Sequence, residues 1–321
     1  MSHFKNVAIA GGGSIGVAFA LQFARAGKAV RIFEQSPERC ALIPGEIGAR
    51  LEMLGAAGLL EGEAGVVAAR IQVTPELHSA VADCHLVVEC VPEIVDIKRE
   101  LFAQLERHVG PDVPLCSASS ALPVSRFCSE LATRQRCLIA HPGNPPYLIP
   151  VVELVPAPFT DAAVVARCTS YFQEVGMSPV LVKHEVEGFV FNRLQGALLR
   201  EAYCLVRDGV ASVEDVDKVV RDGLGLRWSV IGPFETVDLN TRGGIAAHAQ
   251  KMGPAYQRMG QERGQNDPWT DALVQDVAAQ RRAVLPLDQW EARVEWRDRQ
   301  LMQLAKMRKA RAANDDAGTS G

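Results

Sequence analysis

A histidine and a glutamate twelve residues apart are the side chains in this sequence best placed for acid–base chemistry. His141 closes a strand predicted at 138–141, and Glu153 lies in a second predicted strand, 151–155, which is otherwise apolar. A carboxylate in an apolar strand is costly unless it has a partner. If the two side chains pair, Glu153 holds the imidazole in one tautomer and stabilises the imidazolium that forms when His141 accepts a proton. We therefore predict a general base and its orienting partner, the alternative being a structural histidine at the end of a strand.

A glycine-rich turn supplies a second candidate site. It reads Gly11-Gly12-Gly13-Ser14-Ile15-Gly16, which fits G-x-G-x-x-G, and it lies between a strand predicted at 7–10 and a helix predicted to run to residue 26. In this context the first glycine permits the tight turn, the third lets the backbone approach a pyrophosphate, and the last lets the helix pack close to the strand. The pyrophosphate would meet free N–H groups at the helix N-terminus. These six residues are predicted to bind a dinucleotide, the alternative being a glycine-rich turn of another α/β protein.

The next predicted strand, 30–33, is followed by Glu34, 18 residues after Gly16. A carboxylate at this point accepts hydrogen bonds from the adenosine ribose hydroxyls and repels a 2′-phosphate. No arginine or lysine immediately follows it. The sequence therefore predicts NAD rather than NADP as the cofactor. In the alternative interpretation, Glu34 is simply an exposed residue.

The predicted elements would bring these residues together at one edge of a sheet. Strands are predicted at 7–10, 30–33, 86–89, 115–117, 138–141, 151–155 and 180–182, with helical patterns such as 95–109 and 162–175 between them. This alternation is typical of a parallel sheet covered by helices, and ligands bind such sheets where the strands end. After Gly188 the pattern is helical, with helices at 189–206, after a capping box at 212–215, and after Pro286. We predict a doubly wound, Rossmann-type α/β domain at 1–187, an all-helical substrate and dimerisation domain at 188–310, and a disordered tail at 311–321.

The composition excludes several classes of function. The chain has 321 residues, a net charge of −4 and 48% hydrophobic residues, which predicts a globular protein without a surface for nucleic acid or anionic membranes. Its eight cysteines form no Cys-x-x-Cys pair and lie mostly in apolar runs, which favours reduced thiols of a cytoplasmic protein over a disulfide framework. We expect no secretion signal and no membrane span, and no spacing of side chains indicates a metal site.

Seven sequence motifs extend over nearly the whole chain. They are ECVPE at 89–93 with Lys98, HPGNPPY at 141–147, VELVP at 152–156, GFVFNRLQ at 188–195, DGLG at 222–225, IGPFET at 231–236 and EWRD at 295–298. Together they resemble the 3-hydroxyacyl-CoA dehydrogenase superfamily and, within it, the L-gulonate 3-dehydrogenase or lambda-crystallin branch. The resemblance implies an NAD-dependent dehydrogenase that forms a homodimer.

The same resemblance implies roles for further residues. It places Ser120 and Asn192 beside the substrate oxygen, where a hydroxyl and an amide can polarise a developing carbonyl. It places Glu93 and Lys98 near the nicotinamide half of the cofactor. Without the resemblance, Ser120 would be a loop residue, Asn192 a helix cap, and Glu93 with Lys98 a solvated pair.

Arg227 is the candidate for recognising the substrate. It lies shortly before the Gly232-Pro233 turn, at a point where the acyl-CoA enzymes of the resembling family are apolar. An arginine can hold a free carboxylate through two parallel hydrogen bonds. We predict that Arg227 binds the carboxylate of a small acid, helped by Arg242 or Asn240 across a dimer interface. The alternative is a surface salt bridge.

These observations predict NAD-dependent oxidation of the 3-hydroxyl of a small, L-gulonate-like hydroxy acid to the 3-keto acid. The alternative is a 3-hydroxyacyl-CoA dehydrogenase, acting for example on 3-hydroxybutyryl-CoA, whose pocket must hold a thioester and a long pantetheine arm. A third possibility is a structural protein that binds the cofactor without turnover. The intact set of Ser120, His141, Glu153 and Asn192 argues against that possibility.

Overall fold

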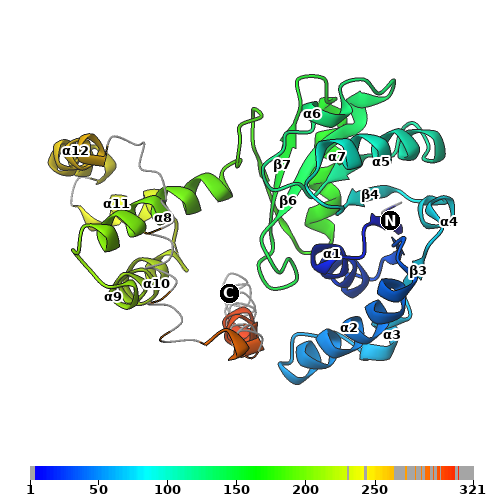
Figure 1. The fold of residues 1–321 in the computed structure, drawn as a ribbon, viewed down its shortest axis with the longest axis horizontal. Coiled ribbons are helices and arrows are strands. Elements are labelled where there is room, and N and C mark those ends of the chain that lie inside the picture. The colour runs from blue at the N-terminus through cyan, green and yellow to red at the C-terminus, as the bar shows by residue number, and fades with distance from the viewer. Residues whose placement is uncertain are drawn as a thin grey trace, which may run out of the picture. The chain divides into compact units, whose positions relative to one another are not determined.

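The computed structural model describes residues 4–229, 231–241 and 244–263, and beyond them only separate positions up to residue 310, of which 286–289 and 298–307 are the longest runs. Contacts divide the chain into two compact units. The sheet unit comprises Met1–Arg193 together with Val294–Gly321, and the helical unit comprises Leu194–Arg293. Figure 1 shows that the sheet belongs to the first of these and that the described part of the second is built from helices.

An eight-stranded sheet forms the centre of the sheet unit, in the order β3-β2-β1-β4-β5-β6-β7-β8. The strands are β1 (Asn6–Ala10), β2 (Ala29–Phe33), β3 (Ile71–Thr74), β4 (Leu86–Glu89), β5 (Leu115–Ser117), β6 (Cys137–Pro142), β7 (Val151–Pro156) and β8 (Ser178–Leu181). Neighbouring strands are parallel except for β6 and β7, which are antiparallel. The strand order reverses between β1 and β4, which is the switch point where such sheets bind ligands. The predicted doubly wound fold is confirmed.

Helices cover both faces of this sheet because alternate residues of each strand point to opposite faces. On one face, Val7 and Ile9 of β1 belong to a buried cluster with Phe19, Phe23 and Phe172 from α1 and α7. On the other face, residues of β1, β4 and β5 pack with α4, α5 and α6 in a second cluster. The central strands are therefore buried on both sides, as parallel strands require.

The helices of the sheet unit include the two predicted at 95–109 and 162–175, each of which ends one residue earlier than predicted. In chain order, the helices are α1 (Ser14–Arg25), α2 (Pro37–Ala56), α3 (Ala64–Ala68), α4 (Leu77–Val81), α5 (Val95–His108), α6 (Ser125–Cys128) and α7 (Ala162–Glu174), with a 3₁₀ turn at Arg134–Arg136. Gly27 follows α1 with a φ of +83°, a conformation suited to glycine. The Ser36 hydroxyl accepts a hydrogen bond from the Arg39 N–H, and Pro37 starts α2.

The helical unit buries few apolar side chains. Its described elements are most of α8 (Phe191–Arg207), α9 (Val213–Lys218), a π-helical segment (Val219–Leu224), α10 (Gly225–Trp228), α11 (Pro233–Asn240) and α12 (Gly244–Arg263). The N-cap of the predicted capping box is confirmed, because the Ser212 hydroxyl accepts from the Asp215 N–H. Cys204 and Val213 are the buried apolar residues among the described part of this unit. Large apolar side chains are exposed at Leu194, Leu199, Val210, Val219, Leu226, Trp228, Phe234, Leu239, Ile245, Tyr256 and Met259.

The structure differs from the sequence-based expectation at the edges of the sheet. The strand β3 is not predicted, because four residues that alternate apolar and polar at an edge give a weak pattern. The strand β8 begins two residues before the predicted 180–182 and includes Pro179, which an edge strand tolerates.

The last predicted helix is described only in part. A 3₁₀ turn at Leu287–Gln289 follows Pro286, and residues 298–307 are helical. Within the sheet unit, Met302 is buried in a cluster with Leu54, Leu59 and Leu148. Trp290 and Val294, two apolar positions of this predicted helix, and the tail predicted at 311–321 lie outside the described residues. The domain boundaries at 187 and 310 stay a prediction.

Across the described part of the chain, no helix has both the length and the apolar character that crossing a bilayer demands. All eight cysteines carry free thiols.

Candidate active site

The glycine-rich turn joins β1 to α1 in the conformation that its sequence predicts. Gly11 has a φ of +117°, and a Cβ atom there would lie 2.8 Å from the carbonyl of Cys90. A Cβ on Gly16 would lie 2.0 Å from the Gly11 oxygen, so the start of α1 can approach the strand only with glycine at this position. A Cβ on Gly13 would meet no protein atom within 4 Å. The turn is thus tightly packed at its two ends and open at Gly13.

A cavity of about 720 Å³ lies against this turn. It is lined by Gly11, Gly12, Gly13, Phe33, Glu34, Gln35, Cys90, Val91, Pro92, Ile97, Glu100, Leu101 and Gln104, from the ends of β1, β2 and β4 and from α5. The first intrahelical bond of α1 runs from the Val17 N–H to the Gly13 carbonyl, so the preceding N–H groups have no partner within the helix. An open turn, a helix N-terminus and a cavity of this size fit a dinucleotide.

Glu34 lies at the end of β2, on the wall of this cavity. Its Oε2 atom accepts a hydrogen bond from the Gly12 N–H at 3.0 Å, and its Oε1 atom accepts one from the Ser36 N–H at 3.0 Å. Each carboxylate oxygen retains capacity for a further donor such as a ribose hydroxyl. Its position is the one predicted for reading the adenosine ribose.

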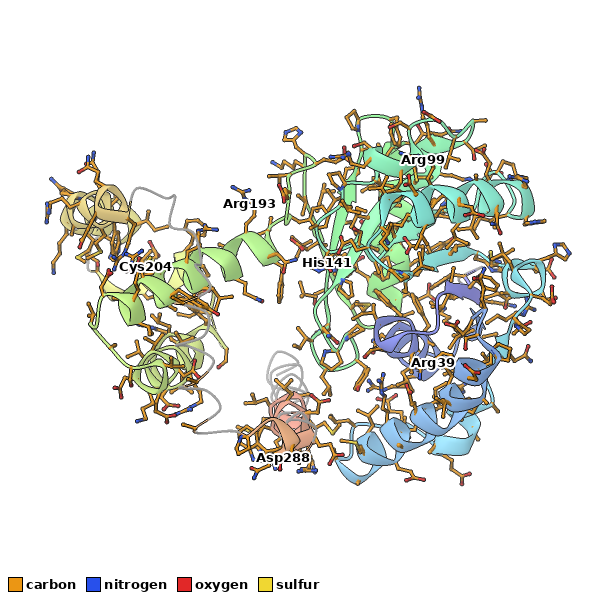
Figure 2. All side chains as sticks on the ribbon, viewed as in Figure 1. Arg39, Arg99, His141, Arg193, Cys204 and Asp288 are labelled. Carbon is orange, nitrogen blue, oxygen red and sulfur yellow. The ribbon has the colours of Figure 1, made fainter. Side chains whose placement is uncertain are left out.

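His141 and Glu153 face each other across the antiparallel pair β6–β7, where they are register partners. The Nδ1 atom of His141, which is labelled in Figure 2, lies 2.7 Å from Oε2 of Glu153. Both side chains are buried. The other oxygen of Glu153, Oε1, accepts from the N–H groups of Val190 at 2.7 Å and Phe191 at 2.9 Å. Burial favours the neutral acid, but the hydrogen bonds from His141 and these two N–H groups outweigh it and lower the pKa of Glu153. The carboxylate is therefore charged and held on both sides.

Two phenylalanines surround the imidazole. The ring centroid of His141 lies 5.8 Å from that of Phe189 and 6.2 Å from that of Phe191. Phe189 is fully buried and has a φ of +48°, which is rare for a bulky residue. Gly188 before it has a φ of +75°. These two left-handed residues turn the chain immediately before Val190 and Phe191, whose N–H groups bind Glu153, and such backbone strain concentrates at functional sites.

Ser120 and Asn192 are brought together beside α8. The Nδ2 atom of Asn192 donates to the backbone carbonyl of Ser120 at 3.0 Å. Asn192 is the second residue of α8, directly after Phe191, so it lies close in sequence to the N–H groups that bind Glu153. The structure thus gathers three of the predicted catalytic residues around the start of one helix, with His141 held by Glu153.

The comparisons with known proteins agree with this geometry. The family model for the 3-hydroxyacyl-CoA dehydrogenase NAD binding domain matches residues 6–186, and the one for the 3-hydroxyacyl-CoA dehydrogenase C-terminal domain matches residues 188–285. The chain belongs to the 3-hydroxyacyl-CoA dehydrogenase family. It is an NAD-dependent oxidoreductase, as predicted.

Relatives of this dehydrogenase place it in the lambda-crystallin branch. A lambda-crystallin homolog from Bos taurus is 39% identical over 94% of this chain and 95% of its own. An L-carnitine dehydrogenase from Streptomyces coelicolor is 36% identical over 83% of this chain and 80% of its own. Among solved structures, the NAD⁺-dependent 5-formyl-3-hydroxy-2-methylpyridine 4-carboxylic acid 5-dehydrogenase, described as a dismutase, is similar with a TM-score of 0.80, at 27% identity over 95% of this chain and 98% of that one.

In this dehydrogenase Lys98 is buried and its ammonium does not face solvent. Its Nζ atom lies 2.7 Å and 2.9 Å from the two carboxylate oxygens of Glu89, a fully buried residue at the end of β4. The Glu89 carboxylate also accepts from the Ser117 hydroxyl and the Val91 N–H. The interpretation of Lys98 as part of a solvated pair is wrong, since the lysine is 1% exposed. Its predicted contact with the cofactor stays a prediction.

Glu93 organises the loop that carries Ser120. One of its oxygens accepts from the Ser119 hydroxyl and from the N–H groups of Ala121 at 2.7 Å and Leu122 at 3.0 Å. Partial burial raises the pKa of Glu93, but these hydrogen bonds outweigh it and leave the pKa lowered. A charged Glu93 therefore fixes the chain on both sides of Ser120.

Sequence reasoning missed two residues of this region. Glu89 is the partner of Lys98, and the signal was a carboxylate in an otherwise apolar strand, the same signal that pointed to Glu153. Arg39 is the second, because its Nε atom donates to the Gly12 carbonyl at 2.9 Å although it lies five residues beyond Glu34.

The predicted carboxylate ligand lies in the helical unit. Arg227 is exposed on α10, and its guanidinium makes no hydrogen bond or ion pair with any residue of the described part of the chain. Asn240 ends α11, and Arg242 lies outside the described residues. Within the described residues no cluster of three or more histidine, cysteine or acidic side chains could hold a metal ion.

Proposed function

We propose that this dehydrogenase oxidises the 3-hydroxyl of a small, L-gulonate-like hydroxy acid to the 3-keto acid, with His141 as the general base. The observation that carries the proposal is the 2.7 Å hydrogen bond between His141 Nδ1 and Glu153 Oε2, beside a start of α8 that also carries Asn192. Oxidation of an alcohol needs a group that removes the hydroxyl proton as the hydride departs. A buried imidazole held by a charged carboxylate meets that need.

The hydrogen bonds define which imidazole atom takes the proton. In neutral His141 the proton lies on Nδ1, because that nitrogen faces the acceptor-only carboxylate of Glu153. Nε2 is then the free lone pair and accepts the hydroxyl proton of the substrate. The resulting imidazolium is stabilised by the negative charge of Glu153, which costs no rearrangement because the pair is already formed. NAD, when bound, supplies the acceptor for the hydride.

Ser120 and Asn192 are proposed to contact the oxygen that becomes the carbonyl. The Asn192 amide has two N–H donors, of which one is used by the Ser120 carbonyl, so one remains for substrate. The Ser120 side chain can donate a second hydrogen bond. Glu93 and the start of α8 hold the two residues in place, which is what an electrostatic contact to a developing charge requires.

A free acid, rather than a thioester, is favoured by two observations. Arg227 offers an exposed guanidinium with no ionic partner among the described residues, and a guanidinium matches a carboxylate geometrically. Two similar proteins are named for small molecules, L-carnitine and a pyridine carboxylic acid. The alternative substrate, a 3-hydroxyacyl-CoA such as 3-hydroxybutyryl-CoA, is supported by the family description.

Steady-state kinetics with NAD on matched substrates tests the proposal. We expect kcat/KM on L-gulonate or a short free 3-hydroxy acid to exceed that on the corresponding CoA thioester by about a hundredfold or more, because only the free acid offers a carboxylate to the Arg227 guanidinium. The reverse order would establish the thioester enzyme. Turnover of neither class would contradict both.

The Arg227→Ala and Arg227→Lys variants test the carboxylate contact. Alanine should raise KM for the free acid and leave NADH affinity unchanged, whereas lysine should restore part of the loss. An alanine variant with the wild-type KM would remove Arg227 from the proposal.

We further propose a cytoplasmic homodimer. The helical unit exposes a series of large apolar side chains, and patches of this kind on a globular protein usually contact a partner. The eight free thiols suit a reducing compartment. Light scattering on the purified protein tests the dimer, and a monomeric mass at micromolar concentration would contradict it.

A further inference from the structure

The backbone of Gly12 is hydrogen-bonded to a carboxylate and to a guanidinium, those of Glu34 and Arg39, at the proposed adenosine end of the cofactor cavity. Its N–H donates to Oε2 of Glu34 at 3.0 Å, and its carbonyl accepts from Nε of Arg39 at 2.9 Å. Glu34 and Arg39 are therefore attached to the same residue of the glycine-rich turn. In dinucleotide-binding folds an acid at the end of this strand reads the ribose 2′-hydroxyl, whereas a nearby arginine accommodates a 2′-phosphate. This chain carries both kinds of side chain.

A third residue, Glu46, binds both Nη atoms of Arg39. The Nη2 atom of Arg39 lies 2.8 Å from Oε2 of Glu46, and Nη1 pairs with Oε1, so the guanidinium is bound at two points (Figure 2 labels Arg39). Both residues lie on α2, seven positions apart. The pair is partly exposed, with side-chain accessibilities of 26% and 35%. The hydrogen bonds between them raise the pKa of Arg39 and lower that of Glu46, so both side chains remain charged.

The charges around Gly12 explain why the arginine does not favour a phosphate. Glu34, Arg39 and Glu46 together carry a net charge of about −1, whereas a phosphate monoester carries about −1.5 to −2 at neutral pH. The fork of Arg39 that could bind phosphate oxygens in a bidentate manner is already filled by a carboxylate of similar geometry. A 2′-phosphate would have to displace Glu46 and approach Glu34.

We propose that Glu46 is a specificity-determining residue that keeps this site selective for NAD over NADP by holding Arg39 in a two-point ion pair. It acts through Arg39, which it positions, and it does not itself contact the cofactor. Removal of its charge frees the guanidinium donors and makes the local charge neutral. The site then accepts a 2′-phosphate although Glu34 is unchanged.

The test measures binding without any hydride transfer, by titrating the full-length protein with 2′,5′-ADP and with 5′-AMP in a calorimeter. The variant is Glu46→Gln, which keeps the size of the side chain and removes its charge. We expect the affinity for 2′,5′-ADP to rise about tenfold, the value of one charge-assisted hydrogen bond, with that for 5′-AMP unchanged. KM for NADP in the assay should fall in parallel.

Three variants separate this effect from a general loss of negative charge. Glu52→Gln removes an exposed acid from the same helix and should leave the ratio of the two affinities at the wild-type value. Arg39→Gln/Glu46→Gln should return the ratio to that value, because the phosphate ligand is gone. Glu46→Asp retains the charge but shortens the reach of the carboxylate, so it should raise the affinity for 2′,5′-ADP less than Glu46→Gln does. It serves as the test variant if Glu46→Gln does not fold.

Two results would overturn the proposal. One is an unchanged ratio of 2′,5′-ADP to 5′-AMP affinity in both Glu46 variants. The other is a gain that persists in the Arg39→Gln/Glu46→Gln double variant. Because neither calorimetric titration involves the hydroxy acid, the affinity ratio does not depend on the proposed substrate.

Discussion

Glu153 lies opposite His141 in the antiparallel pair β6–β7 and divides its two oxygens between the imidazole and the start of α8. One carboxylate therefore fixes the proposed base and the helix that brings Asn192 to Ser120. The antiparallel pairing of β6 and β7 makes this possible, because it places His141 directly opposite Glu153, twelve residues later in the sequence.

Replacing His141 with glutamine should lower kcat by about 10²- to 10⁴-fold, the usual contribution of a general base. The cofactor cavity is lined by other residues, so the affinity for NADH measured by fluorescence should not change. His184→Gln, which alters an exposed histidine of the same unit, is the matched control and should keep wild-type activity. An active His141→Gln enzyme would refute the mechanism.

Glu153→Gln should change how stability depends on pH. The pKa of Glu153 is lowered in the folded protein relative to its ordinary value of 4.5. The charged carboxylate therefore stabilises the fold above that value, and the stabilisation is lost as the pH falls through the lower folded-state pKa. The difference in unfolding free energy between wild type and Glu153→Gln should thus be largest near neutral pH and shrink on acidification. A difference that grew in acid would contradict the direction of the shift.

Lys98→Met should destabilise the protein by about 3–5 kcal/mol, because it leaves the buried Glu89 carboxylate without its cation. Burial already raises the pKa of Glu89, so the variant would fold with that acid protonated or not at all. The double variant Glu89→Met/Lys98→Met removes both charges and should recover most of the loss in urea unfolding. A double variant less stable than Lys98→Met would show that the pair is not the source of the effect.

Alanine at two glycines should separate packing from cofactor binding. Gly16→Ala places a Cβ 2.0 Å from the Gly11 oxygen and should lower both the melting temperature and the affinity for NADH. Gly13→Ala meets no protein atom within 4 Å, so it should fold normally. Its methyl group would occupy the space of the pyrophosphate and weaken NADH binding by about tenfold or more. Normal NADH affinity in Gly13→Ala would contradict the proposed binding mode.

The fold could be predicted from the sequence where the pattern is strong and local. The strands β4 and β5 have the predicted bounds, and the cap at Ser212 is as predicted, because a buried apolar run or a capping side chain acts within a few residues. The edge strand β3 was missed, since its half-buried residues carry little periodicity.

The site could be predicted where a charged residue lies in an otherwise apolar segment. Glu153 in an apolar strand indicated a partner, and the structure places it on His141. Ser120 and Asn192 could be found only through the family resemblance, because each looks ordinary in its own segment. The ion pair of Arg39 with Glu46 depends on how α2 lies against the glycine-rich turn, which no local pattern reveals.

The return of the chain to the sheet unit at Val294–Gly321 bears on how chimaeras of this protein can be built. The helical unit is joined to the rest at two places rather than one, so exchanging it with that of a relative needs crossovers near both residue 193 and residue 294. A truncation that removes Met302, or a single crossover that replaces it, would expose the apolar side chains of Leu54, Leu59 and Leu148 to solvent. The nucleotide-binding part would then carry an exposed apolar surface that favours aggregation.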